Sequence, residues 1–133
     1  MTNRATLIAL AQRVEEAEGP DRNLDFVIFR ALHLEYAGPE WREFGGGLWH
    51  VQDSSDARCL PPPERTPSRW TASLDAALTL VPDGYVVNLG NDEPIWAQVW
   101  IDNDPTSRGG GTTMALALCA AALRARAQME RGK

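Results

Sequence analysis

The stretch TMALALCAAALR, residues 113–124, decides the fold of this chain. Alanine and leucine are strong helix formers, and either Thr112 or Thr113 can cap the free amides at the start of a helix. Basic residues from Arg124 onward favour the negative end of that helix. We therefore predict a long C-terminal helix over residues 113–130 whose apolar stripe covers a sheet. The stripe repeats at helical spacing and comprises Leu116, Cys119, Ala120, Leu123 and Ala127.

Two segments before this helix predict the sheet. Residues 85–89 (YVVNL) and 96–101 (WAQVWI) alternate in the two-residue period of strands, and the loop at residues 90–94 makes them an antiparallel hairpin. Trp96 and Trp100 fall on the face opposite Ala97, Val99 and Ile101. Because both faces would carry large apolar groups, we expect helices on each side of the sheet.

The remaining segments complete an α+β pattern in one domain of 133 residues. Helical spacing predicts a helix over residues 2–18, a second from Asp21 or Asn23 to Gly38, and a short one over residues 73–81, preceded by extended residues 69–71. Residues 44–67 are an irregular loop with one short strand at 48–51, and residues 102–111 are a glycine-rich loop. The prediction is a helix-sheet-helix sandwich with a short antiparallel sheet of three or four strands.

Composition excludes several classes of protein. Apolar residues make up 44% and charged residues 23% of the chain, as in globular proteins. The net charge of −5 and the pI near 5.0 make nucleic acid an unfavourable partner. Two cysteines are too few for a disulfide framework, and we find no signal segment or membrane-length apolar run. These features predict a cytoplasmic protein that does not enter a membrane.

Segments at both ends and in the middle of the chain resemble a known family. Residues 70–84 (WTASLDAALTLVPDG) and 113–124, together with residues 18–25 (EGPDRNLD), are similar to the phage ABA sandwich domain, a small phage and prophage protein. The resemblance covers about two thirds of the chain and not residues 44–67. It implies a helix-sheet-helix sandwich in a phage-derived gene, within the cytoplasm of a bacterial host. It implies no established activity and no catalytic residues.

The first candidate site is the glycine-rich segment at residues 107–113 (SRGGGTT). Successive glycine amides before a helix start, with Arg108 beside them, can collect an anion. The ligand-binding candidates here are Arg108, Gly110, Gly111, Thr112 and Thr113. A nucleotide-hydrolase phosphate loop would need a lysine that this segment lacks, and the alternative is a flexible loop followed by an ordinary threonine cap.

The five tryptophans suggest a second candidate surface. Arg69 and Trp70, with Trp49, lie near the long loop and could stack on a base or on a protein partner. The alternative is that the tryptophans pack in or over the core. Arg69 and Trp70 join the ligand-binding candidates on the first interpretation.

No catalytic or metal signature emerges. His50, Asp53 and Cys59 share one loop, but their spacing matches no standard zinc site. Cys119 falls on the apolar stripe, where a thiol behaves as a small hydrophobe. We predict no metal, no cofactor and no catalytic residue, with a hydrolase working through His50 as the least favoured hypothesis.

These observations lead to two main hypotheses of function. The preferred one is a non-enzymatic phage or prophage accessory protein that binds a small anionic or nucleotide ligand. The alternative is a protein–protein interaction module, such as a homo-oligomer or a phage assembly component, that uses the tryptophans as a patch.

Overall fold

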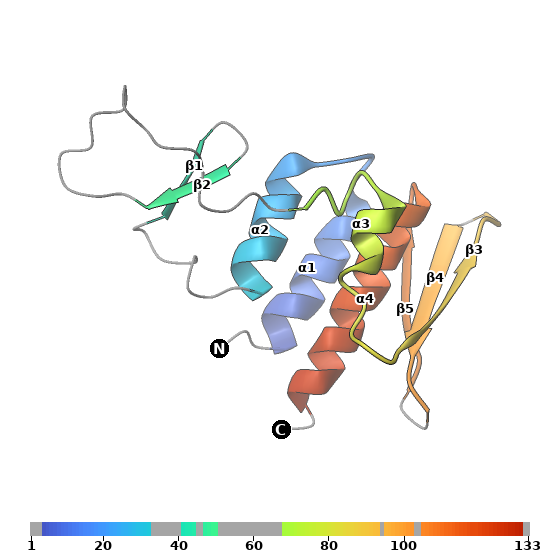
Figure 1. Cartoon of the computed structure of the whole chain (residues 1–133). Helices are drawn as coiled ribbons and strands as arrows, with labels where there is room; N and C mark the ends of the chain where they lie inside the picture. Colours follow the sequence, from blue (N-terminus) through green and yellow to red (C-terminus); the bar gives the residue numbers. More distant parts are fainter. Residues whose placement is uncertain are drawn as a thin grey trace.

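The computed structural model describes residues 4–32, 41–44, 47–50, 68–93, 95–102 and 105–131, with the backbone path alone for 41–44, 47–50, 130 and 131. Across the molecule in Figure 1, α2, α1 and α4 are followed by β5, β4 and β3. The α+β class, the short antiparallel sheet and the long C-terminal helix are confirmed. The elements are α1 (Arg4–Glu16), α2 (Arg22–Leu32), β1 (Trp41–Phe44), β2 (Gly47–His50), α3 (Leu74–Leu78), β3 (Val86–Gly90), β4 (Ile95–Trp100), β5 (Ser107–Gly111) and α4 (Met114–Arg131).

The main sheet has the strand order β3-β4-β5, and both pairings are antiparallel. The predicted hairpin is confirmed, with Val86 opposite Trp100 and Gly90 opposite Trp96. A turn precedes it, where Gly84 adopts a φ of +85° and the Tyr85 amide donates to the Pro82 carbonyl. Glycine is suited to that turn because a side chain disfavours a positive φ.

Local capping explains where the helices start. The Asp21 carboxylate accepts from the amides of Asn23 and Leu24, and the Thr113 hydroxyl accepts from the Leu116 amide. Ser73 caps α3, which is shorter than the predicted helix and ends at Leu78. Helix α1 ends at Glu16, two residues before its predicted end. Helix α2 is described to Leu32, and the rest of its predicted span, residues 33–38, lies outside the described residues.

Helix α4 is buried on every side over residues 115–123, and not along a single stripe as predicted. It packs against β5 and β4 on one side and against α1 and α3 on others. The reason lies in its composition, since no charged side chain interrupts residues 113–123 and alanine permits close approach from all directions. The C-terminal helix is therefore the centre of the core and not its lid.

Residues 107–111 form strand β5, so the predicted glycine-rich loop is wrong over this part. A Cβ added to Gly109 would lie 2.5 Å from the Ala121 nitrogen and 2.8 Å from the Ala120 Cβ. One added to Gly111 would lie 2.9 Å from the Leu116 Cβ. The glycines thus let the strand backbone touch the backbone of α4, which is a packing role.

The inner face of the sheet carries the fully buried Ala97 and Val99 against α4. The outer face carries Trp96 and Trp100, which are partly exposed, and Val86, which is 48% exposed. Helical cover of both faces was expected, but the described helices that contact the sheet, α1 and α4, pack on the inner face and the β5 edge. Instead, the indole of Trp96 lies across Gly90, where a side chain would collide with the ring.

The predicted irregular segment 44–67 begins with regular structure. The short strand predicted at residues 48–51 is present as β2, over residues 47–50, and it pairs with β1, which sequence reasoning missed. In this pairing Trp41 stands opposite His50 and Phe44 opposite Gly47. Residues 51–67 lie outside the described residues.

Candidate functional site

The predicted anion-binding segment is already engaged by the protein's own side chains. The Gly110 amide donates to the Glu15 carboxylate across 2.9 Å, and the Thr112 hydroxyl donates to the Ala17 carbonyl. Thr113 caps α4, and the Arg108 side chain is exposed. A carboxylate thus occupies the place that an anion would take.

Glu15 and Arg124 form an ion pair that runs along the free side of β5. The two terminal nitrogens of the Arg124 guanidinium donate to the two Glu15 oxygens across 2.6 and 2.7 Å. One of them also donates to the Arg108 carbonyl across 2.8 Å. Together the pair satisfies one donor and one acceptor of β5, which is how an edge strand is protected from pairing with another chain.

The electrostatics of this pair favour the charged forms. The hydrogen bond from Arg124 lowers the pKa of Glu15, with burial opposing it and the Gly110 amide assisting. The same hydrogen bond raises the pKa of Arg124. At the end of β5, an open hollow lined by Ile95, Gly111 and Thr112 carries a further acid, Glu93. The negative charge of these acids makes the place unfavourable for a phosphate or another anion.

We expect Glu15→Gln to lower the free energy of unfolding by about 1–2 kcal/mol at neutral pH, because it weakens three charge-assisted hydrogen bonds, two from Arg124 and one from the Gly110 amide. The pKa of Glu15 is lower in the folded chain than in the unfolded one. Its stabilisation is therefore complete above about pH 5 and is lost as the pH falls through the folded pKa. Urea unfolding of both proteins at pH 7 and pH 3 measures the difference.

The matched control is Glu16→Gln, which makes the same charge change at an exposed position of α1. It should alter the free energy of unfolding by less than about 0.5 kcal/mol at either pH. Equal effects of the two substitutions at pH 7, or a Glu15→Gln effect that persists undiminished at pH 3, would contradict the role assigned to the pair.

Trp70 is a core residue and not part of an exposed stacking surface. It is 6% exposed, and its ring stacks with Phe29 at a centroid distance of 6.4 Å. Its indole nitrogen donates to the Thr79 hydroxyl across 3.0 Å. The segment is a turn and not the predicted extended stretch, since the amides of Ala72 and Ser73 donate to the Arg69 carbonyl. Of the two candidates here, only Arg69 is exposed.

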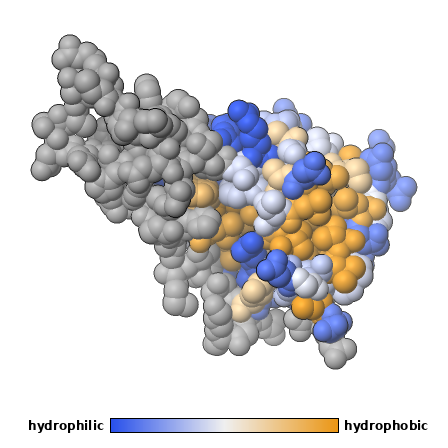
Figure 2. All heavy atoms as spheres, in the orientation of Figure 1, coloured by the Kyte–Doolittle hydropathy of each residue, from blue (hydrophilic) through white to orange (hydrophobic). Residues whose placement is uncertain are grey.

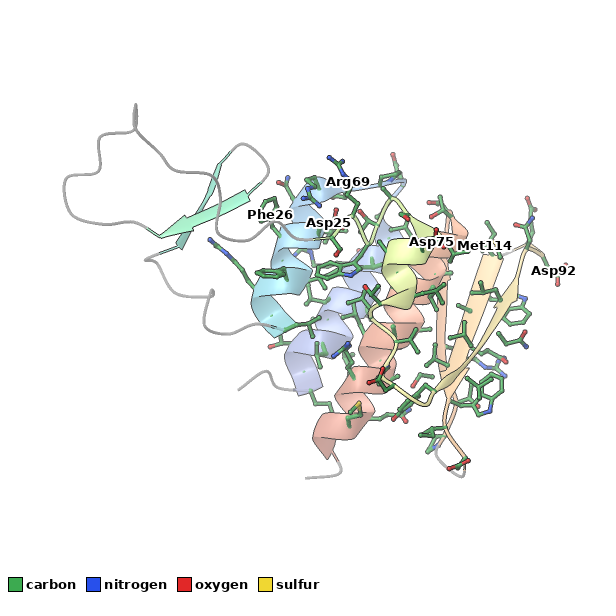
Figure 3. The ribbon with its side chains drawn as sticks, in the orientation of Figure 1. Asp25, Phe26, Arg69, Asp75, Asp92 and Met114 are labelled. Atoms are coloured by element: carbon green, nitrogen blue, oxygen red, sulfur yellow. The ribbon has the colours of Figure 1, made fainter. Side chains whose placement is uncertain are left out.

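The structure does not bring the two groups of candidate residues together. The Cys119 thiol of α4 donates to the Trp70 carbonyl across 3.2 Å, whereas Gly109 and Gly111 of β5 pack on other positions of the same helix. In Figure 3, Arg69 lies beside α2 and Asp92 lies at the end of the β3–β4 hairpin on the other side of α4. Helix α4 thus separates Arg69 and Trp70 from the Arg108–Thr113 segment.

Sequence reasoning missed the buried acid beside Trp70. Asp25 is 1% exposed; it accepts from the Thr71 amide across 2.9 Å and from the Arg22 guanidinium across 3.1 Å. Arg22 also donates to the Ser68 carbonyl, so the cluster fastens residues 68–71 to the start of α2. Every described hydrogen bond of Asp25 is directed at the protein itself, which indicates a structural role.

Cys119 is buried, as expected for a residue of the apolar stripe. Burial, with a smaller contribution from the charge of Asp25, raises the pKa of its thiol to about 12. A thiol with this pKa is almost fully protonated at neutral pH, so it is a poor nucleophile.

The other edge of the sheet is strand β3, and no described strand covers it. Among the described strands, β3 pairs with β4 alone, and its sequence, VVNLG, carries no charge. Figure 2 shows a broad hydrophobic surface where α3, α4 and the strands meet. On these elements Leu78 is 43% exposed, while Leu74, Val87 and Leu89 are half-buried. Sequence reasoning predicted neither the β3 edge nor this hydrophobic surface as a site. The uncharged sequence of the strand is a signal that could have indicated such an edge.

The side chains of the metal hypothesis lie outside the described part of the structure. Asp53 and Cys59 are not described, and for His50 only the backbone is described. Among the described residues no group of three His, Cys, Asp or Glu side chains is arranged to hold a metal ion. The same part of the chain contains no helix with both the length and the apolar character needed to cross a membrane.

No family model, no curated protein and no solved structure matches the chain. The class that the structure itself defines is an α+β protein in which a buried alanine-rich helix supports a three-stranded antiparallel sheet. Among the described residues, an ion pair protects one edge of this sheet and no strand pairs with the other.

Proposed function

We propose that this protein is a non-enzymatic interaction module that binds another protein through the open side of its sheet. The observation that carries the proposal is the contrast between the two edges. At β5, Glu15 and Arg124 occupy backbone groups that a further strand would use. At β3, no described side chain does so, and apolar surface flanks the strand. An extended partner segment can add to such an edge by main-chain hydrogen bonds.

The geometry gives less support to the small anionic or nucleotide ligand. Its best candidates, Gly110 and Gly111, lie in a strand beside Glu15 and Glu93, and Trp70 is buried. Negative side chains and an occupied amide both work against an anion at this place. The alternative function, a protein–protein contact, therefore becomes the main one.

The biological setting belongs to the proposal as well. A phage or prophage origin and action in the cytoplasm of a bacterial host rest on the resemblance of residues 70–84 and 113–124 to the phage ABA sandwich domain. In that setting, an uncharged sheet edge would serve an accessory or assembly role, because such edges recruit partners without a preformed pocket.

Site-specific photo-crosslinking tests the proposal in cells that carry the gene. A benzophenone amino acid at Asn88, an exposed position of β3, should give a discrete covalent adduct on irradiation, and mass spectrometry identifies the captured protein. The same probe at Gln12, an exposed position of α1, is the matched control and should give none of that adduct. No adduct from Asn88, or the same adducts from both positions, would overturn the proposal.

A further inference from the structure

We infer that the partner at the open edge is a second copy of this chain, whose β3 pairs with β3 of the first in antiparallel register about a two-fold axis at Asn88. This inference rests on the proposed function and names the partner for that same surface. The two sheets would join into one continuous sheet of six strands. Closed two-fold pairing of this kind uses the same patch on both copies.

The strand is self-complementary in this register. β3 spans Val86–Gly90, so a two-fold axis at Asn88 matches the strand with its copy over its whole length. Val87 then stands opposite Leu89 of the second copy, which places apolar side chains together on the inner face. Cross-strand apolar pairs stabilise an antiparallel sheet, and a one-residue slip would place apolar residues opposite the wrong face.

The outer face shows the same fit. In this register the exposed Val86 stands opposite Gly90 of the second copy, the residue across which the Trp96 indole lies. The Trp96 indole fills the space over that glycine, and it offers an apolar surface against which the valine can pack. At the axis the two Asn88 side chains meet, and an amide can donate to and accept from its equivalent.

Charge favours this place of contact for two copies of the same chain. Each copy carries a net charge of −5, so most faces repel each other. β3 contains no charged residue, whereas exposed acids lie just beyond its ends at Asp83, Asp92 and Glu93. In the proposed dimer, exposed acids of both copies gather beyond the two ends of the paired strands. The dimer should therefore tighten when salt screens these acids.

The inner face of β3 also has room for a partner. Helix α4 packs chiefly on β5 and β4, which leaves Val87 and Leu89 half-buried, and Leu78 of the neighbouring α3 is exposed. Strand pairing over five residues together with this flanking surface is a small interface. We expect a dissociation constant on the order of 1–100 µM, as for other interfaces at the low end of buried area.

Sedimentation equilibrium of the purified protein between about 5 and 500 µM, a range set by that affinity, tests the dimer. Asn88→Lys places two like charges opposite each other at the axis and should weaken dimerisation at least about tenfold. Gln12→Lys makes the same charge change on α1 and should shift it less than about twofold. Raising the salt from about 0.02 to 0.3 M should strengthen the dimer of the unaltered chain.

A cysteine at the axis tests the register independently of the lysine variant's folding. In a Cys59→Ser background, where the buried Cys119 is the remaining native thiol, oxidised Asn88→Cys should form a disulfide-linked dimer. Equivalent residues at a two-fold axis between antiparallel strands lie about 4.5–5.5 Å apart, within reach of a disulfide. Gln12→Cys in the same background should not cross-link above the level of random collision.

The outcomes separate this inference from the proposed function. A monomer at every concentration, with a photo-adduct from Asn88 to a different protein, overturns the self-pairing and leaves the interaction module standing. A monomer with no adduct overturns both. A dimer that Asn88→Lys leaves unchanged, or that fails to form the Asn88→Cys disulfide, uses another surface and also overturns the inference.

Discussion

Asp25→Ala is expected to lower the free energy of unfolding by about 2–4 kcal/mol, since it leaves the buried Thr71 amide without its acceptor and removes the buried partner of an ion pair. The substitution removes the acceptor of the Thr71 amide and of the Arg22 guanidinium at a position that is 1% exposed. It should also loosen the attachment of residues 68–71 to α2. Chemical denaturation followed by circular dichroism measures the change.

Asp75→Ala is the matched control, because Asp75 occupies the first turn of α3 just as Asp25 occupies the first turn of α2. Asp75 is exposed, so its loss should cost at most about 0.3–1 kcal/mol through the helix dipole. Asp25→Asn keeps one oxygen acceptor and should fall between the two. Similar losses from Asp25→Ala and Asp75→Ala would show that the cluster does not fasten the two segments.

Gly109→Ala should destabilise the fold by about 2–3 kcal/mol, because overpacking forces backbone shifts. The added Cβ would meet the backbone of α4, including the Ala121 nitrogen at 2.5 Å, where no flexible side chain can move aside. In most strands the same substitution is favourable, because it restricts the unfolded chain. The sign of the effect therefore distinguishes close packing from a flexible glycine loop.

Gly19→Ala controls for the general effect of replacing a glycine. A Cβ at Gly19 meets nothing within 4 Å, so the free energy of unfolding should change by less than about 0.5 kcal/mol. Thermal and urea unfolding of the two variants give the comparison. If Gly109→Ala unfolded no more easily than Gly19→Ala, the contact between β5 and α4 would be looser than the structure shows.

Elements governed by neighbouring residues were predictable from sequence. Asp21, Ser73 and Thr113 cap helices as their side chains indicate, and the hairpin of β3 and β4 follows the alternation of residues 85–101. Capping and strand alternation involve groups within a few positions of one another, so a local pattern contains them. The fold class was predicted from these elements together.

The predicted site is a different case. Its residues were selected for local chemistry, but the Gly110 amide bonds to Glu15, which lies 95 positions earlier in the chain. Trp70 stacks with Phe29 and accepts a hydrogen bond from Cys119 at its carbonyl. Each of these partners is remote in sequence, and no spacing rule connects it to the candidate residue.

The amino-acid sequence alone determined where the helices start, which segments alternate as strands, and that a long alanine-rich helix near the C-terminus would pack on the sheet. Only the tertiary structure decided that α4 is the centre of the core, that the glycine run is a strand packed against α4, and that Trp70 is buried. It also decided that an ion pair protects the β5 edge, whereas no described strand pairs with the β3 edge. The physical reason is the distance along the chain over which each effect acts. Propensity and capping act between residues a few positions apart, whereas burial, ion pairing and edge protection depend on which distant segments meet.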